Sequence, residues 1–332
     1  MLTDNYTEEE IQALITLAEL SYPIENPNNN HYKPFPKNIG EAKTYFRRFA
    51  LDLSKSYKRL LNKGLVYQEN DAWLLTANGK EIANEIRLLR PPIYYFYRDF
   101  YTAIEHSQAF DAYATRVFGK NLGQHGFSDL KEIHLMMEKL ELDKDSNVLD
   151  IGCGNGKITE YISDITQARV TGIDYIPEAI MLATRRTADR RYRLNFIIGN
   201  LEILDFPPMT FDAMILIDSI FFGRQMKTTL AGLSAVLKPT GRMAIFNGDY
   251  LNDDFVTSLK ANNLKCATYD ISEGHYRHLQ LKHKVASELE KAFKAEGNTF
   301  IWKNLMTESL ASAEPHNAAL SKIRRYLHIV TK

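Results

Sequence analysis

A buried strand that runs into a glycine-rich turn constrains this chain more than any other feature. Residues 148–156 read Val-Leu-Asp-Ile-Gly-Cys-Gly-Asn-Gly, and a helical pattern follows from Lys157 to Ile162. Glycines in such a turn let the backbone approach a ligand more closely than a Cβ would allow. Lys157 stands where a dinucleotide fingerprint has its third glycine, and the Gly-Lys-Ser/Thr of a phosphate-binding loop is absent. A nucleotide-type cofactor without a phosphate is therefore favoured.

Strand and helix patterns alternate from residue 147 onward. Strands fit, with helices between them, at 147–151, 169–173, 194–198, 212–217 and 242–246. This alternation predicts right-handed crossovers and a parallel, doubly wound α/β sheet. Two more strands, at 267–271 and 325–330, enclose a mostly helical insertion at about 272–321, which we expect to be a lid.

Polar side chains follow the predicted strands at the sheet edge where α/β proteins bind ligands. Asp174 ends the second strand and is placed to accept both hydroxyls of a ribose. Asn200, after the third strand, is predicted to read an adenine edge, with Leu201 and Tyr175 on either side of the ring. Asp218 follows the fourth strand at the same edge.

In this order, the residues resemble the motifs of the class I S-adenosylmethionine-dependent methyltransferases. Asp150 to Gly156 is similar to their first motif, D/E-x-G-x-G-x-G, and Leu233 to Arg242 to the segment that leads into their fifth strand. Asn200 departs from the family, which usually has an aspartate there. The resemblance covers about 90–332 and implies a Rossmann-like seven-stranded sheet, S-adenosylmethionine as cofactor and enzymatic methyl transfer. The cofactor-binding residues that we expect are Asp150, Gly152, Cys153, Gly154, Asp174, Tyr175, Asn200, Leu201, Asp218, Tyr101 and Gln124.

Several of these assignments have a structural alternative. Asp150 either touches the cofactor or supports the glycine turn by hydrogen bonds. Tyr101 belongs to an aromatic-rich helical stretch at 93–118, where most tyrosines are expected to pack in the core.

The loop Gly-Gln-His-Gly-Phe at 123–127 carries the candidate catalytic residue, His125. It resembles the His-x-Gly-aromatic segment of small-molecule methyltransferases. A base is needed only when the methyl acceptor must lose a proton. His125 is therefore predicted to remove that proton, to line the pocket or to hold the scaffold.

The methyl acceptor is expected to be a small molecule. The sequence does not identify whether an O, N or C atom of it receives the methyl group. Residues 218–221, Asp-Ser-Ile-Phe, lack the D/N-P-P-Y/F motif of family members that act on nucleic-acid bases. We expect selectivity from side chains of the lid. No metal is expected, because the histidines of the lid neither follow the H-E-x-x-H pattern nor lie near cysteines with the spacing of a zinc site. The lid side chains in question are His275, Tyr276, His278, His283 and Trp302.

Residues 1–90 are predicted to form a mainly helical, winged-helix-like domain, followed by the methyltransferase domain at 91–332. Residues 54–66 resemble a recognition helix and the entry to a wing. Between 33 and 63 nine basic side chains oppose two acidic ones, an excess of seven. We favour a scaffold role for this domain, in which it forms a homodimer or forms one wall of the active site. Nucleic-acid methylation and a cofactor-sensing DNA-binding regulator are the alternatives.

The composition is that of an ordinary globular protein, with 332 residues and a formal net charge of zero. Only two cysteines are present, and no apolar run approaches the roughly 20 residues that span a bilayer. The start of the chain is acidic rather than basic. We therefore expect a cytoplasmic protein without membrane association.

Overall fold

The computed structural model describes residues 5–21, 52–90, 94–223, 225–248, 253–320 and 323–332. The chain divides into two compact units, Met1–Asp99 and Phe100–Lys332, each described here by itself. The division falls inside helix α5 (Tyr94–Ile104) rather than at the expected residue 90.

Besides the start of α5, the described part of the first unit contains three helices and a two-stranded hairpin. The elements are α1 (Glu8–Ser21), α3 (Ser54–Asn62), β1 (Val66–Glu69), β2 (Ala72–Leu75) and α4 (Ala77–Leu89). The N–H of Thr7 donates to Glu10 Oε2 at 2.9 Å, and the N–H of Glu10 donates to Thr7 Oγ1 at 3.3 Å. This reciprocal pair is a capping box, and Thr followed three residues later by Glu is the sequence pattern that predicts one. The helix predicted at 39–49 lies outside the described residues, and the winged-helix assignment stays a prediction.

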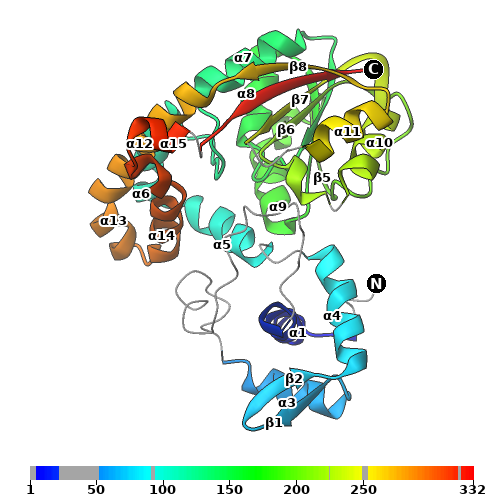
Figure 1. Ribbon diagram of the computed structural model, residues 1–332, viewed down its shortest axis with the longest axis vertical. Helices are drawn as coiled ribbons and strands as arrows, with labels where there is room; N and C mark the ends of the chain where they lie inside the picture. Colours follow the sequence, from blue (N-terminus) through cyan, green and yellow to red (C-terminus); the bar gives the residue numbers. More distant parts are fainter. Residues whose placement is uncertain (1–4, 22–51, 91–93, 224, 249–252, 321–322) are drawn as a thin grey trace. The chain divides into compact units, whose positions relative to one another are not determined.

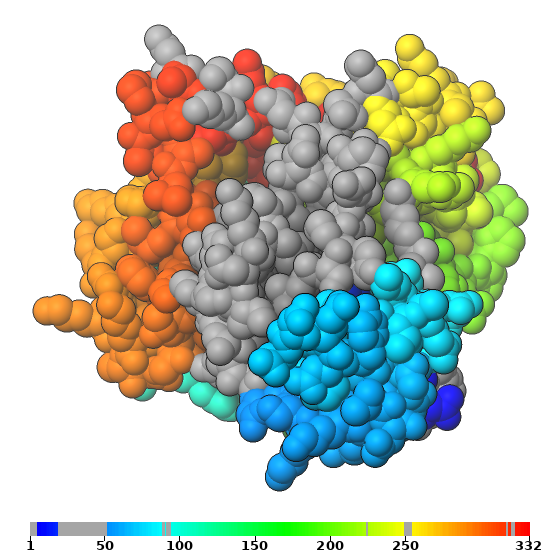
Figure 2. All heavy atoms as spheres, turned by 60° about the horizontal axis from the view of Figure 1, so that its bottom comes forward, coloured from blue at the N-terminus to red at the C-terminus, as the bar shows by residue number. Residues whose placement is uncertain are grey.

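Two basic side chains of this unit pair with a buried carboxylate. Glu10 is 1% exposed, and its oxygens lie 2.9 Å from Lys63 Nζ and 3.3 Å from Arg59 Nε. The contact joins α1 to the predicted recognition helix. These two charges are therefore part of the unit's own packing, which the excess of basic residues in the sequence does not reveal. Figure 2 shows this unit in blue and cyan.

The second unit is built on a seven-stranded sheet in the order β5-β4-β3-β6-β7-β9-β8 (Figure 1). Strands β3 to β7 are parallel, and β9 runs antiparallel to both of its neighbours. This topology confirms the predicted doubly wound α/β fold. The strands are β3 (Asn147–Ile151), β4 (Arg169–Asp174), β5 (Leu194–Ile198), β6 (Phe211–Ile217), β7 (Leu237–Asn247), β8 (Lys265–Asp270) and β9 (Tyr326–Thr331).

Strand β7 begins earlier than the pattern indicates. Leu237 pairs with Phe211 and Arg242 pairs with Ala213, so residues 238–241 form an irregular bulge rather than a turn before the strand. Cross-strand pairing on β6 keeps this proline-containing stretch in the sheet, at an irregularity that tolerates proline.

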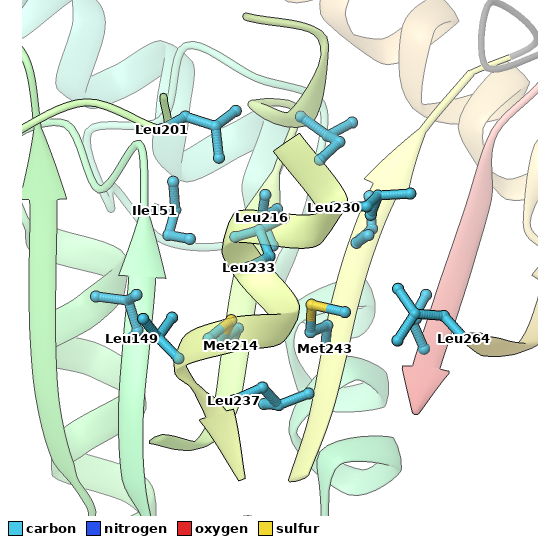
Figure 3. Close-up of a cluster of buried hydrophobic side chains, with 14 of the residues drawn as sticks. Leu149, Ile151, Leu201, Met214, Leu216, Leu230, Leu233, Leu237, Met243 and Leu264 are labelled. Atoms are coloured by element: carbon cyan, nitrogen blue, oxygen red, sulfur yellow. The ribbon is translucent and has the colours of Figure 1, made fainter. Parts of the chain in front are cut away.

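Helices cover both faces of the sheet through side chains that alternate along the strands. On one face, Leu149 and Ile151 pack with residues of α10 and α11 (Figure 3). On the other face, Val148 and Val170 pack with residues of α7 and α8. The helices outside the lid are α6 (Gln108–Phe118), α7 (Leu130–Leu140), α8 (Lys157–Thr166), α9 (Pro177–Arg186), α10 (Met226–Val236) and α11 (Asp253–Ala261).

The insertion between β8 and β9 is helical, as expected, and we call residues 272–320 the lid. Its helices are α12 (Ser272–Glu288), α13 (Glu290–Ala295), α14 (Thr299–Glu308) and α15 (His316–Leu320). Helix α12 packs on α6 and α14, beside the aromatic segment (Figure 1). That segment is two helices rather than one, because Ser107 caps the start of α6 by accepting from the N–H of Phe110. Among the described helices, none has the length and hydropathy that a membrane span requires.

Candidate functional site

The glycine turn joins β3 to α8 at the carboxyl edge of the parallel strands. Gly152, Gly154 and Gly156 all have positive φ angles, of 78°, 56° and 74°. The N–H groups of Gly152 and Cys153 donate to the carbonyl of Ile173, at 2.9 and 3.0 Å. A side chain is therefore strained at each of the three glycines, and the turn is fastened to the neighbouring strand β4.

Asp174 binds the glycine turn through backbone hydrogen bonds. Its Oδ2 accepts from the N–H of Gly154, and its Oδ1 accepts from the N–H of Ile176, both at 2.9 Å. Burial raises the pKa of Asp174 to about 6, against the effect of these bonds. The backbone of Tyr175 is a third donor to this carboxylate. Two carboxylate oxygens have about four lone-pair sites, so capacity for a ligand hydroxyl remains.

Asp150 is buried beneath the turn. Its Oδ2 accepts from Thr159 Oγ1 in α8 at 2.6 Å. Burial raises the pKa of Asp150 to about 7, and the nearby charge of Asp174 acts in the same direction. The bond to α8 is the loop-supporting contact that the sequence offered as an alternative to cofactor binding.

Tyr101 and Cys153 lie against glycines of the site. A Cβ at Gly154 would be 2.3 Å from Tyr101 Oη, so the ring of Tyr101 covers the turn. A Cβ at Gly172 would be 2.9 Å from Cys153 Sγ. Burial raises the pKa of the Cys153 thiol well above its usual range, so this group stays protonated and unreactive.

Two buried amide groups at the turn have no hydrogen-bond partner among the described residues. They are Nδ2 of Asn155 and Nε2 of Gln124. Gln124 uses its other amide atom, Oε1, to accept from the N–H of Leu122 at 2.8 Å. A Cβ at Gly123 would lie 2.6 Å from the Asn155 side chain, so the 123–127 loop reaches the turn. Unpaired buried donors are costly, and they mark a place where a ligand with acceptor oxygens would fit.

The three residues predicted to surround the adenine ring contact other parts of the protein in this structure. Asn200 Oδ1 accepts from the N–H groups of Glu202 and Ile203 at 2.9 and 3.0 Å, which leaves the Nδ2 donor for a ligand. Leu201 is 8% exposed and belongs to the apolar cluster labelled in Figure 3. The Tyr175 ring centroid lies 6.1 Å from that of Phe222. The structure thus adds Phe222, which the sequence did not single out, to the aromatic side chains near Tyr175.

Asp218 accepts hydrogen bonds from Arg325 and from the histidine loop, and its contact with the cofactor stays a prediction. Its oxygens accept from the two terminal nitrogens of Arg325 at 2.6 and 3.0 Å, and Oδ2 also accepts from the N–H of Phe127 at 3.0 Å. Arg325 is 2% exposed and also donates to Glu132 and Ser128. This buried ion pair ties β9 to the strand end of β6 and to the loop.

His125 faces the lid. Its Nε2 lies 2.9 Å from Asn304 Oδ1 and 3.3 Å from Glu308 Oε1, both in α14. Its ring centroid lies 5.0 Å from that of Phe100 in an edge-to-face arrangement. Burial lowers the pKa of His125, and the charge of Glu308 opposes that shift. Burial therefore favours the neutral form of the ring.

Two of the predicted lid residues, His275 and His278, form a buried cluster with Lys282. The sequence analysis did not single out Lys282. Lys282 is 0% exposed, and its Nζ lies 3.2 Å from Glu308 Oε2 and 4.4 Å from the ring centroid of Phe127. The predicted lid residues His275 and His278 are also buried, with Nδ1 and Nε2 respectively unpartnered among the described residues. The signal for Lys282 was its helical spacing from the buried residues His275, Leu279 and Ala286.

The predicted lid residues His283 and Trp302 form hydrogen bonds with other lid residues. His283 Nδ1 lies 3.2 Å from Ser309 Oγ, and Trp302 Nε1 donates to the carbonyl of Ala286 at 3.1 Å. These contacts join the lid helices to one another.

Comparison with known protein families identifies the second unit. The family described as "Methyltransferase domain" matches residues 142–313, which is more than half of the chain. An O-methyltransferase of Aspergillus nomiae, rstn1, is 30% identical over 110 residues, covering 32% of this chain and 49% of that protein. Sterol 24-C-methyltransferase erg-4 of Neurospora crassa is 29% identical over 154 residues, covering 42% and 40%. The chain thus spans less than half of the length of these curated relatives.

Solved structures share the fold at low sequence identity. Phosphoethanolamine N-methyltransferase 2 of Haemonchus contortus, in complex with phosphomonomethylethanolamine and S-adenosylhomocysteine, has a TM-score of 0.55 and 14% identity. The match covers 70% of this chain and 59% of that one. The [4+2]-cyclase SpnF has a TM-score of 0.50 and 17% identity, covering 61% and 80%. Since a cyclase shares the architecture, the fold alone does not decide the reaction.

Proposed function

Because this chain belongs to the methyltransferase-domain family, as its motifs predicted, we propose that it is an enzyme that transfers a methyl group from S-adenosylmethionine to a small molecule. The observation that carries the proposal is the glycine turn of β3, fastened to Asp174 at the carboxyl edge of the sheet. Open α/β sheets bind their ligands at this edge.

The residues at this edge fit the cofactor. Asp174 retains lone-pair capacity for the ribose hydroxyls, and the three glycines would let a ligand come close to the backbone of the turn. The unpartnered amides of Asn155 and Gln124 suit the cofactor's amino-acid carboxylate. We assign Asn200 to the adenine edge through Nδ2, beside Tyr175.

Further assignments complete the cofactor side. Gly152, Gly154 and Tyr101 form its walls, Leu201 supports the adenine region from the core, and Asp150 and Cys153 support the turn from below. We assign Asp218 to the cofactor edge of the sheet and, through its bond to the N–H of Phe127, to the orientation of the loop that carries His125.

When bound, the cofactor supplies a methyl group on a positively charged sulfur, ready for in-line displacement. Alignment of the reacting atoms contributes up to roughly 7–11 kcal/mol to such reactions. The chain's own contribution beyond alignment is His125, a neutral and buried base on the loop next to Gln124. A positioned base adds about 10²- to 10⁴-fold where the acceptor must lose a proton.

A small acceptor is favoured by the buried polar side chains beneath the lid. His275, His278 and Lys282 are all buried, and all three lie on α12 of the lid. A buried site of this kind suits a molecule that can be enclosed. Pairing of Lys63 and Arg59 with Glu10 also reduces the basic surface on which a nucleic-acid role depends. We assign the first unit to dimer formation or to a wall of the site.

The proposal is tested by incubating the full-length protein with methyl-labelled S-adenosylmethionine and a metabolite extract, followed by mass spectrometry. We expect label in one or a few metabolites and none in RNA or protein fractions. Parallel calorimetry with S-adenosylhomocysteine should show binding. Label in RNA alone, or in protein alone, would overturn the small-molecule assignment, and cofactor binding without any transfer would favour a sensor.

A further inference from the structure

The seven-stranded sheet has two edge strands, β5 and β8, and they differ in charge. β8 reads Lys-Cys-Ala-Thr-Tyr-Asp, with a charge at each end, and Lys139 Nζ lies 5.3 Å from the ring centroid of Tyr269. β5 reads Leu-Asn-Phe-Ile-Ile and carries no charge. Charged side chains, lysine above all, protect edge strands against pairing with other chains. The edge at β5 therefore lacks a protection that the edge at β8 has.

The outer side of β5 carries backbone groups that are open to hydrogen bonding. The N–H of Gly199 donates to the carbonyl of Asp174 at 3.0 Å, so odd-numbered residues of this segment face β4. The direction of the backbone groups alternates along a strand, and the even-numbered residues Leu194, Phe196 and Ile198 therefore face outward. Among the described residues, β5 pairs with β4 alone, and the outward N–H and C=O groups have no partner.

Apolar side chains are exposed at the carboxyl end of the same strand. Ile197 is 38% exposed and Ile198 is 58% exposed, and Ile203 in the following loop is 68% exposed. A short, uncharged segment of β-branched and aromatic residues on an open edge is the kind that pairs with another chain. Such pairing would remove these isoleucines from water, which adds apolar burial to the backbone hydrogen bonds.

Opposite charges flank the two ends of β5. Arg191 precedes the strand, whereas Glu202 and Asp205 follow it, and all three residues are exposed. Parallel pairing of two β5 strands would bring like charges together. Antiparallel pairing about a twofold axis instead brings Arg191 of each copy toward the acidic end of the other. This charge complementarity favours a second copy of the same chain as the partner, in the antiparallel orientation.

We propose that two copies of this chain form a dimer through their β5 strands. The strands pair antiparallel around a twofold axis near Phe196, so that Leu194 of one copy lies opposite Ile198 of the other. The outward N–H and C=O groups then bond to each other, and the two sheets become one continuous sheet. The interface lies within the second unit. It depends neither on the proposed methyl transfer nor on the role assigned to the first unit.

Sedimentation velocity of the full-length protein tests whether this dimer forms. Under reducing conditions, from about 1 to about 100 μM, we expect the dimer fraction to rise with concentration, because a strand-edge interface is small and its affinity is modest. A protein that stays monomeric at every concentration would overturn the proposal.

Hydrogen exchange followed by mass spectrometry locates the contact. At about 100 μM, compared with about 1 μM, peptides that contain residues 194–198 should exchange more slowly, because their outward N–H groups become bonded. Peptides that contain residues 265–270, at the other edge of the sheet, serve as the control and should exchange alike at both concentrations. Protection confined to the first unit or to β8 would reveal a different dimer and contradict the proposal.

A proline at an outward position separates the interface from the fold. Ile198→Pro removes an N–H that faces outward and leaves the bonds to β4 in place, as edge strands tolerate. We expect the dissociation constant of the dimer to rise at least about 10-fold. Ile198→Val keeps the N–H and should dimerise as the wild type does. Circular dichroism checks that each variant is folded.

A second variant replaces Ile198→Pro if the proline disturbs folding. Ile198→Lys puts a charge at the edge and should weaken the dimer by a similar factor. Ile165→Lys is the matched control, because Ile165 on α8 is also 58% exposed. A dimer of wild-type strength in a folded Ile198→Pro or Ile198→Lys variant would overturn the proposal.

Charge reversal tests the orientation of the two strands. Arg191→Glu alone and Glu202→Lys alone each bring like charges together across the axis, and each should weaken the dimer at least about 3-fold at low salt. An equimolar mixture of the two variants brings opposite charges together at both ends of the interface. The mixture should therefore dimerise more strongly than either variant alone. Equal dimerisation of the mixture and the single variants would contradict antiparallel pairing of β5.

Discussion

The cofactor side and the His125 side of the candidate site are built in different ways. On the cofactor side, the carboxylate of Asp174 binds backbone N–H groups, one of them only 20 positions away in the chain. On the other side, His125 meets Asn304 across 179 positions, and Asp218 meets Arg325 across 107. The first arrangement depends on local backbone geometry, whereas the second depends on side chains that only the completed fold brings together.

This difference has an energetic consequence. Backbone donors satisfy the buried carboxylate of Asp174 without a second buried charge. The His125 side instead buries the ammonium of Lys282 and the guanidinium of Arg325 with their carboxylate partners. Buried ion pairs contribute little net stability but are costly to break from one side. We therefore expect stability to be most sensitive on the His125 side and cofactor affinity to be most sensitive at the turn.

The largest expected effect is on stability, from Arg325→Met. The variant leaves the carboxylates of Asp218 and Glu132 buried without their partner, which should lower the unfolding free energy by about 3–5 kcal/mol. The exposed neighbour is a matched control. Arg324 lies 3.8 Å from Asp270, and Arg324→Met should cost less than about 1 kcal/mol. Urea unfolding followed by circular dichroism measures both, and equal small losses would show that the Arg325 network is not a buried ion pair in solution.

Local rules account for most of what the sequence predicts correctly. The strands at 147–151 and 194–198 match β3 and β5, because buried runs bounded by turn residues specify strands. The capping box of Thr7 and Glu10 is likewise a contact over three residues. Each of these features is decided within one element or between neighbours.

Tertiary contacts account for what the sequence did not show. Pairing with β6 draws the start of β7 back to Leu237, and Ser107 splits the aromatic stretch by capping α6. Glu308 and Arg325 look like ordinary charged residues until the lid and β9 bring them to the histidine loop. Asp218 likewise pairs with Arg325, a partner that its position after a strand does not reveal in the sequence.

The next largest effect concerns the turn. Gly154→Ala puts a Cβ at a positive φ of 56° and 2.3 Å from Tyr101 Oη, so either the turn or the ring must move. We expect affinity for S-adenosylhomocysteine, measured by calorimetry, to fall on the order of 100-fold. Gly232→Ala is the control, because a Cβ there meets open space on α10. If both variants bind alike, the turn is not a close wall of the cofactor site.

His125→Ala separates the two sides kinetically. If His125 is the base, turnover should fall at least about 100-fold while affinity for S-adenosylhomocysteine changes by less than about 3-fold. His106→Ala, at an exposed position, should leave both quantities unchanged. A loss of only a few-fold in turnover would reduce His125 to a residue that lines the pocket.

The smallest effect is expected from Asp150→Asn. This variant tests whether burial is what raises the pKa of Asp150 beneath the turn. Burial raises the pKa of Asp150 to about 7, above its value of about 3.8 in an unfolded chain. Between these values the folded state binds more protons than the unfolded state, so stability must fall as the pH rises from about 4 to about 7. Asn still accepts from Thr159 through Oδ1 but does not titrate.

Urea unfolding at pH 5 and pH 7 measures this dependence on the cofactor-free protein. The wild type should lose about 1–2 kcal/mol more than Asp150→Asn over this interval, because only the wild type has a carboxylate that must take up a proton, or be buried while ionised, on folding at pH 7. Asp145→Asn, at an exposed position, should keep the wild-type dependence. Equal pH dependences in all three proteins would mean that Asp150 is ionised throughout. A charge, rather than a neutral acid, would then support the turn, and the cofactor side would depend on buried charges as the His125 side does.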